Sequence, residues 1–210
     1  MLRVLRVLAL AGPAVAAAAV PAAAQGPIAR TYAAYGFAAL GAGDFAGAIR
    51  EFKGALDLYP SYVDAHIGRA VAFVAQDRLL ESWEDLTTAK RYDEDAARKA
   101  AVDELMQGIE VAARLASYRN FLASAKRDAD AVQVGEWAGR FRATLSAFSR
   151  DGAALSFAPD DVLKEYAREL RALGRQTEAS RTEAIADAYL GHRLESWRRL
   201  QEQYEKEQGG

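Results

Sequence analysis

After an apolar leader, the hydrophobic and polar positions of the chain follow the period of amphipathic α-helices. Within residues 96–116, apolar side chains recur every three or four positions, so that one side of a helix is apolar. A similar stripe runs through residues 132–148. A last one runs through residues 192–207, whose other side is rich in Arg, Glu and Gln. Alanine is abundant and only 5 prolines are present, and both features favour helices. The pattern predicts an all-α protein.

The first 24 residues differ from the rest of the chain. Two arginines come first, residues 7–20 are apolar and alanine-rich, and Ala22 and Ala24 place small residues where a signal peptide is cleaved. An apolar stretch of about 14 residues is too short for a membrane span, which takes about 20. We interpret residues 1–24 as a Sec-type signal peptide cleaved near Ala24, and expect no membrane insertion after cleavage.

Charge and cysteine content limit the classes of partner and the cellular compartments that suit this chain. The chain has 27 Lys and Arg, 29 Asp and Glu, and a net charge of −2; loss of Arg3 and Arg6 leaves 25 basic residues and a net charge of −4. A general nucleic-acid binder needs a basic face, so we expect no nucleic-acid partner. An exported chain without cysteine and without an Asn-x-Ser/Thr acceptor suits a bacterial periplasm.

Residues 29–62 have the composition of two packed helices joined by a turn. Small residues stand where antiparallel helices must approach closely, aromatic residues, including Tyr35, are large enough to fill the space between layers, and Gly43 can adopt the left-handed conformation that ends a helix. Pro60 prevents the second helix from continuing. The segment resembles a tetratricopeptide repeat, a 34-residue helix–turn–helix unit. With Ala29 as position 1, the resemblance is carried by Tyr32, Gly36, Ala48, Phe52, Ala55 and Pro60.

Residues 63–96 continue the same register. Ala70 and Ala89 stand at the small positions 8 and 27 of the repeat. His66 stands where the family usually has an aromatic residue, and Arg69 stands where leucine is common. Two repeats in unbroken phase imply a short right-handed solenoid of antiparallel helix pairs.

Beyond Asp95 the register is lost. After two tandem repeats over residues 25–96, we expect additional helices over residues 97–159 that pack on the array. Residues 160–210 then predict a degenerate hairpin, centred on Gly174, and a C-terminal capping helix. A terminal helix with one apolar and one solvated side is what a solenoid cap requires.

The resemblance also implies where a partner would bind. In the family, the first helix of each repeat lines a concave groove, and the residues at those positions here are mostly apolar. Such a groove accepts an amphipathic helix or an extended apolar segment of a partner. Alternatively, the chain's own helices over residues 97–148 fill the groove; the sequence leaves both open. The candidate groove residues are Phe37, Leu40, Ile67, Val71 and Val74.

Candidates for chemistry are few. The two histidines, His66 and His192, lack metal-ligand spacing, and we expect His66 to pack in the interior. Basic residues over 164–181 alternate with glutamates, which predicts ion pairs within helices rather than an anion groove. We expect the acidic runs to lie at helix ends or on solvated faces, not as paired catalytic carboxylates. These runs are 84–85, 93–95 and 160–161.

Together these patterns predict a non-catalytic periplasmic scaffold or adaptor that binds protein partners through the apolar groove and holds no metal or cofactor. The alternative is a self-associating or permanent structural subunit of an envelope or secretion complex. An envelope hydrolase, or an accessory to one, is the third and least favoured interpretation.

Overall fold

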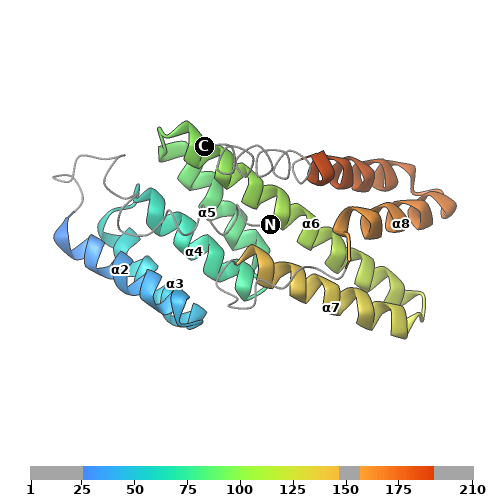
Figure 1. Ribbon diagram of the computed structural model, residues 1–210, viewed down its shortest axis with the longest axis horizontal. Coiled ribbons are helices and arrows are strands. Elements are labelled where there is room, and N and C mark those ends of the chain that lie inside the picture. Colours follow the sequence, from blue (N-terminus) through green and yellow to red (C-terminus); the bar gives the residue numbers. More distant parts are fainter. Residues whose placement is uncertain (1–25, 147–156, 192–210) are drawn as a thin grey trace, which may run out of the picture. The chain divides into compact units, whose positions relative to one another are not determined.

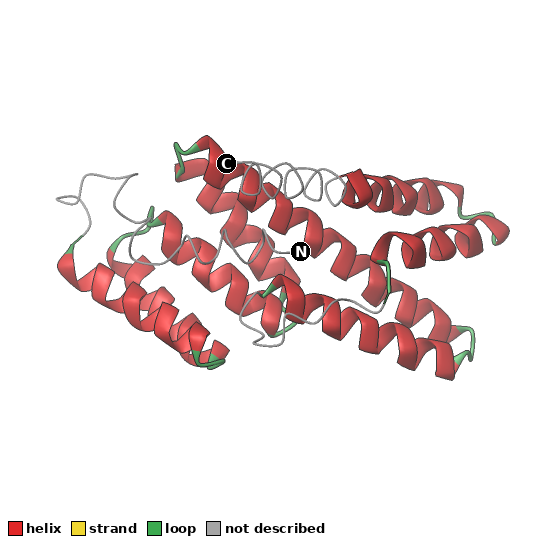
Figure 2. Cartoon of the chain, in the orientation of Figure 1, coloured by secondary structure: helices red, strands yellow, loops and turns green. Residues whose placement is uncertain are grey.

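A computed structural model describes residues 26–146 and 157–191, and every regular element in those ranges is a helix (Figures 1 and 2). The prediction of an all-α protein is therefore confirmed for this part of the chain. The predicted signal peptide and the predicted capping helix, which starts at residue 192, lie outside the described residues. The helices are α2 (Pro27–Gly41), α3 (Phe45–Leu58), α4 (Val63–Ala75), α5 (Leu79–Tyr92), α6 (Ala96–Ser124), α7 (Asp128–Leu145) and α8 (Pro159–Ala172); residues 176–191 are also helical.

One turn design joins the helices in pairs. Gly43, Asp77, Lys126 and Gly174 follow α2, α4, α6 and α8, and all have a positive φ, between 59° and 77°. In each turn the next backbone N–H donates to the carbonyl five residues earlier, at 2.9 Å. This closure satisfies carbonyls that a helix end would leave unpaired. The expected turns at Gly43 and Gly174 are confirmed, and the α6–α7 hairpin is an addition.

The helices gather into two compact units. One contains the described residues up to 109 together with 141–146, and the other contains residues 110–140 and 157–191. Both α6 and α7 therefore contribute to both units.

Phe52 is the centre of the first compact unit. Its ring is fully buried between α2 and α4, and a Cβ added at Gly36 or Gly68 would lie 2.7 or 2.3 Å from it. No side chain larger than hydrogen fits at either position without displacing the ring. The predicted small positions Ala48, Ala55, Ala70 and Ala89 are also completely buried.

Two of the aromatic residues expected to fill the space between layers do not do so. Tyr32 lies against Gly54 of α3, where an added Cβ would meet its ring at 2.9 Å, but it stays partly exposed; Tyr35 is exposed. The physical reason is that α2 is the first helix described, and no described helix covers its outer side.

An aromatic stack organises the second compact unit. The Tyr118 and Tyr166 rings stack with centroids 4.7 Å apart, and Phe121 lies 5.6 Å from Tyr166. In the hairpin of α8 and residues 176–191, four small or apolar side chains from the two helices are fully buried. They are Ala167, Leu170, Ala179 and Ala186.

Candidate functional site

The predicted groove residues lie mostly in the interior of the first compact unit. Leu40 of α2 and Ile67, Val71 and Val74 of α4 are buried. Phe37 is half-buried, with its ring edge-on to Phe52 at a centroid distance of 4.9 Å. The structure therefore brings α2 and α4 together as expected, but it leaves little of this surface open to solvent.

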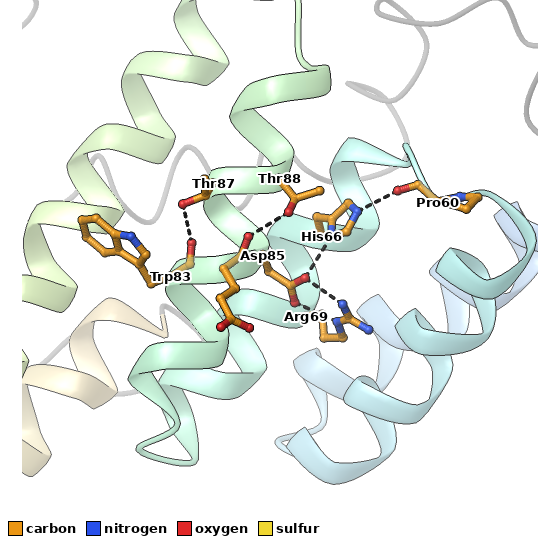
Figure 3. Close-up of polar contacts among 8 residues, drawn as sticks. Pro60, His66, Arg69, Trp83, Asp85, Thr87 and Thr88 are labelled. Atoms are coloured by element: carbon orange, nitrogen blue, oxygen red, sulfur yellow. Dashed lines mark hydrogen bonds and ion pairs between the residues drawn. The ribbon is translucent and has the colours of Figure 1, made fainter.

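A polar cluster lies between α4 and α5, where His66, Arg69 and Asp85 meet (Figure 3). Arg69 forms two hydrogen bonds with the Asp85 carboxylate, both at 2.7 Å. His66 Nδ1 lies 2.9 Å from Asp85 Oδ1, and its Nε2 lies 2.9 Å from the Pro60 carbonyl oxygen. The cluster therefore ties the end of α3 to both helices of the next hairpin.

Both ring nitrogens of His66 face acceptors. A neutral imidazole carries one N–H and donates to one of them, whereas only a doubly protonated ring donates to both. His66 is buried, as expected from the sequence, and neither nitrogen is left to act on a substrate.

Asp85 corrects the expectation that the first acidic run is solvated. Glu84 is exposed, but Asp85 is buried against α4. Burial alone would raise the pKa of the Asp85 carboxyl, but the hydrogen bonds from Arg69 and His66 outweigh it and hold the pKa below its usual value. The Asp85 carboxylate is therefore charged, and the Arg69 guanidinium balances its charge.

A second buried carboxylate, Asp93, lies at the junction of α5 and α6. Arg98 donates to it through Nε and through Nη2, the latter at 2.6 Å from Oδ1, and also lies 3.6 Å from Asp64. Asp95 caps α6 by accepting from the N–H groups of Ala97 and Arg98. The run therefore lies at helix ends as predicted, with Asp93 at the end of α5 and Asp95 at the start of α6, but Asp93 is buried rather than solvated.

The third acidic run is also partly buried. Asp160 lies inside the first turn of α8, whereas Asp161 is exposed. Carboxylates at a helix start interact favourably with its N–H groups, as expected, but Asp160 is not solvated.

In the second compact unit, Glu169 joins three elements. Tyr118 of α6 donates to it at 2.9 Å, and Arg127 donates to both of its oxygens at 2.8 and 3.0 Å while also binding Asp130. Burial raises the pKa of Tyr118 and the bond to Glu169 raises it further, so the phenol stays protonated. These contacts to Glu169 therefore join the α6–α7 hairpin to α8.

The basic residues over 164–181 are paired mainly across the last hairpin. Lys164 binds Asp187 at 3.0 Å, and Arg171 binds Glu183. Arg175 and Glu178 form a pair within one turn, as predicted. The expected ion pairs therefore form, but two of the three join different helices.

None of these clusters presents an open catalytic group. Asp85, Asp93 and Glu169 each face an arginine. Within residues 26–146 and 157–191, no three His, Asp or Glu side chains are placed to hold a metal ion. Among the described helices, none combines the length and apolar character that crossing a membrane requires.

Sequence reasoning did not predict two ion pairs, Arg69 with Asp85 and Arg98 with Asp93. A signal was present at one point, because His66 and Arg69 both depart from the repeat pattern and lie one turn apart on α4.

Comparison of the chain with protein-family models, with curated proteins and with solved structures finds no match. Function is therefore argued from the residues and their geometry.

Proposed function

We propose that this protein is a non-catalytic periplasmic scaffold that binds other proteins, built as a short tetratricopeptide-like solenoid of helical hairpins with a C-terminal cap. The observation that carries the proposal is the recurrence of one hairpin design. The turns at Gly43 and Asp77 stand 34 residues apart with the same closure, and Phe52 fills the gap between Gly36 and Gly68. Stacked hairpins of this kind present extended surfaces that bind proteins.

The polar clusters support a structural role for the charged residues. The arginines that face Asp85 and Asp93 bridge neighbouring helices, and the His66 ring is engaged at both nitrogens. Buried carboxylates held in this way fix the register of one helix against the next.

The groove has two interpretations, and burial bears on the choice. Leu40, Val71 and Val74 are completely buried, which favours the interpretation in which the chain fills the groove itself. A partner then reaches only the rim, where Phe37 is half-buried.

In-cell photo-crosslinking of the exported protein tests the scaffold role. A photoreactive phenylalanine analogue replaces Phe37 in one variant and Val132, an exposed residue of α7, in a control. We expect one defined protein to be captured from position 37 and not from position 132, and the same protein to bind the purified chain.

Capture of no protein from either position, or of a random mixture from both, contradicts partner binding at this rim. A crosslink from position 37 to the chain's own residues identifies the groove as internal core.

A further inference from the structure

The His66 ring joins the connection between α3 and α4 to α5, within the first compact unit (Figure 3). Its Nε2 lies 2.9 Å from the Pro60 carbonyl oxygen, and its Nδ1 lies 2.9 Å from Asp85 Oδ1. Pro60 stands two positions after Leu58, the last residue of α3, whereas Asp85 belongs to the second hairpin. One buried side chain therefore holds the end of the first hairpin against the second.

These two contacts together require two protons on the ring. A carbonyl oxygen and a carboxylate oxygen only accept hydrogen bonds, so a ring nitrogen at 2.9 Å from either one needs an N–H to donate. A neutral imidazole has one N–H, and its other nitrogen would set a lone pair against an oxygen. The geometry around His66 is therefore that of an imidazolium.

The charges around the His66 ring have both signs. Asp85 of α5 attracts a cation at Nδ1, but Arg69, on the same helix as His66, already binds this carboxylate. Pro60 lies just beyond the C-terminal end of α3, where the last helix carbonyls interact favourably with a cation. Other charged residues of α3, α4 and the start of α6 are paired with one another: Lys53 with Asp57, and Arg98 with Asp64 and Asp93.

The two contacts of the ring differ in how easily each is replaced. Asp85 is 5% exposed, so loss of the Nδ1 proton would leave a lone pair against a buried carboxylate. Pro60 is exposed, and water can bind its carbonyl oxygen when the ring does not. Loss of one proton from His66 therefore removes the Nε2 contact and keeps the Nδ1 contact.

We propose that His66 is a proton-dependent link between the first two hairpins: the doubly protonated ring holds both Pro60 and Asp85, and loss of the Nε2 proton releases the α3–α4 connection. This connection is closed by a backbone hydrogen bond from the Tyr62 N–H to the Tyr59 carbonyl, at 3.1 Å, on either side of Pro60. Release of the Pro60 carbonyl therefore loosens this turn. The link goes beyond the scaffold function, which does not require it.

NMR of the ring nitrogens over a series from about pH 5 to about pH 8 tests the link, because histidine changes charge in this range. The chain has two histidines, so His192→Gln leaves His66 as the single one to observe. We expect protons on both nitrogens at the acid end and on Nδ1 alone at the other end. The carbonyl carbon resonance of Pro60 should shift with the same midpoint as the ring.

Hydrogen exchange of the Tyr62 amide measures the release itself. His66→Phe keeps an aromatic ring but cannot take up a proton, and comparison with it at each pH cancels the pH dependence of exchange chemistry. We expect the slower exchange of the wild type, relative to His66→Phe, to diminish by about tenfold from about pH 5 to about pH 8, as one hydrogen bond is lost. The Arg78 amide, which closes the α4–α5 turn, is the internal control and keeps a constant ratio.

Three results overturn the proposal. They are a His66 ring that keeps one protonation state across the series, a neutral ring with its proton on Nε2, and a titrating ring to which neither Pro60 nor the Tyr62 amide responds. If His66→Phe does not fold, the NMR series on the single-histidine chain decides alone.

Discussion

Asp85 is a residue whose charge the fold can keep only with its partners in place. It is buried and accepts from both Arg69 and His66, so removing its charge leaves the half-buried Arg69 guanidinium without a carboxylate. We expect Asp85→Asn to lower the free energy of unfolding by about 3–5 kcal/mol. Urea unfolding at pH 7 measures this, with Asp57→Asn as control. That change breaks the exposed Lys53–Asp57 pair and costs less than about 1 kcal/mol.

The same carboxyl makes stability depend on pH. Burial would raise the pKa of Asp85, but the bonds from Arg69 and His66 lower it below its value in the unfolded chain. Its contribution is therefore complete above the ordinary aspartate pKa of about 4 and is lost as pH falls through the lower folded pKa. Below pH 4 the wild type should lose stability more steeply than Asp85→Asn; equal slopes would contradict the assignment.

Asp64 and Asp93 both face Arg98, but their pKa values are shifted in opposite directions. Burial raises the pKa of Asp64, Arg98 opposes this and the charge of Asp93 adds to it, so the charged form is disfavoured in the fold. For Asp93, burial is outweighed by hydrogen bonds from Arg98 and the Asp95 N–H, and its pKa is lowered. The stability that Asp64 contributes is thus present at low pH and is lost as pH rises through its raised pKa.

Neutral substitutions of these two residues should therefore diverge at pH 7. We expect Asp93→Asn to lower the free energy of unfolding by about 3 kcal/mol. Asp64→Asn should leave it within about 1 kcal/mol of the wild type or raise it. Thermal and urea unfolding of both variants measure the difference. Equal losses in the two variants would contradict this prediction, because they would mean that Asp64 and Asp93 hold Arg98 equally.

At the scale of elements, the α6–α7 turn holds a non-glycine residue in a left-handed conformation. Lys126 has φ 59°, and its side chain is exposed. A left-handed residue with a Cβ costs about 1–2 kcal/mol, so Lys126→Gly should stabilise the protein by about 1 kcal/mol. Gly174→Ala, in the equivalent turn after α8, should destabilise it by a similar amount. Urea unfolding measures both, and a loss of stability in Lys126→Gly would mean that the turn relies on the lysine side chain.

This hairpin also shows why the repeat register could not be followed past Asp95. Its turn holds Lys126 where α2–α3 has Gly43, and its close contacts run in both directions. An added Cβ at Gly108 of α6 would lie 2.4 Å from Leu145 of α7, and one at Gly135 of α7 would lie 3.1 Å from Arg119 Cδ of α6. The repeat pattern, with small residues on the first helix and large ones on the second, describes only the first of these contacts.

At the scale of the whole molecule, sequence reasoning predicted the helical class and the first two hairpins, because period and small residues are local signals. The polar clusters could not be predicted in the same way. Asp85 meets His66 and Arg69 across 16–19 residues, and its exposed neighbour Glu84 makes the run look solvated. Which acid in a run is buried depends on the rotation of α5 against α4, and that is set by packing.

We expect cleavage of the signal peptide near Ala24 to determine the first residue of the exported protein. The peptidase that removes a signal peptide requires small residues such as Ala22 and Ala24 and tolerates any residue between them. We therefore expect Ala24→Phe to block removal of residues 1–24 and Ala23→Phe, its neighbour, to be processed normally. Intact mass of the exported protein distinguishes the two. Because α2 starts at Pro27, the processed chain should keep the helix and its thermal stability. Equal processing of both variants, or a wild-type protein that keeps Met1 after export, would contradict the signal peptide.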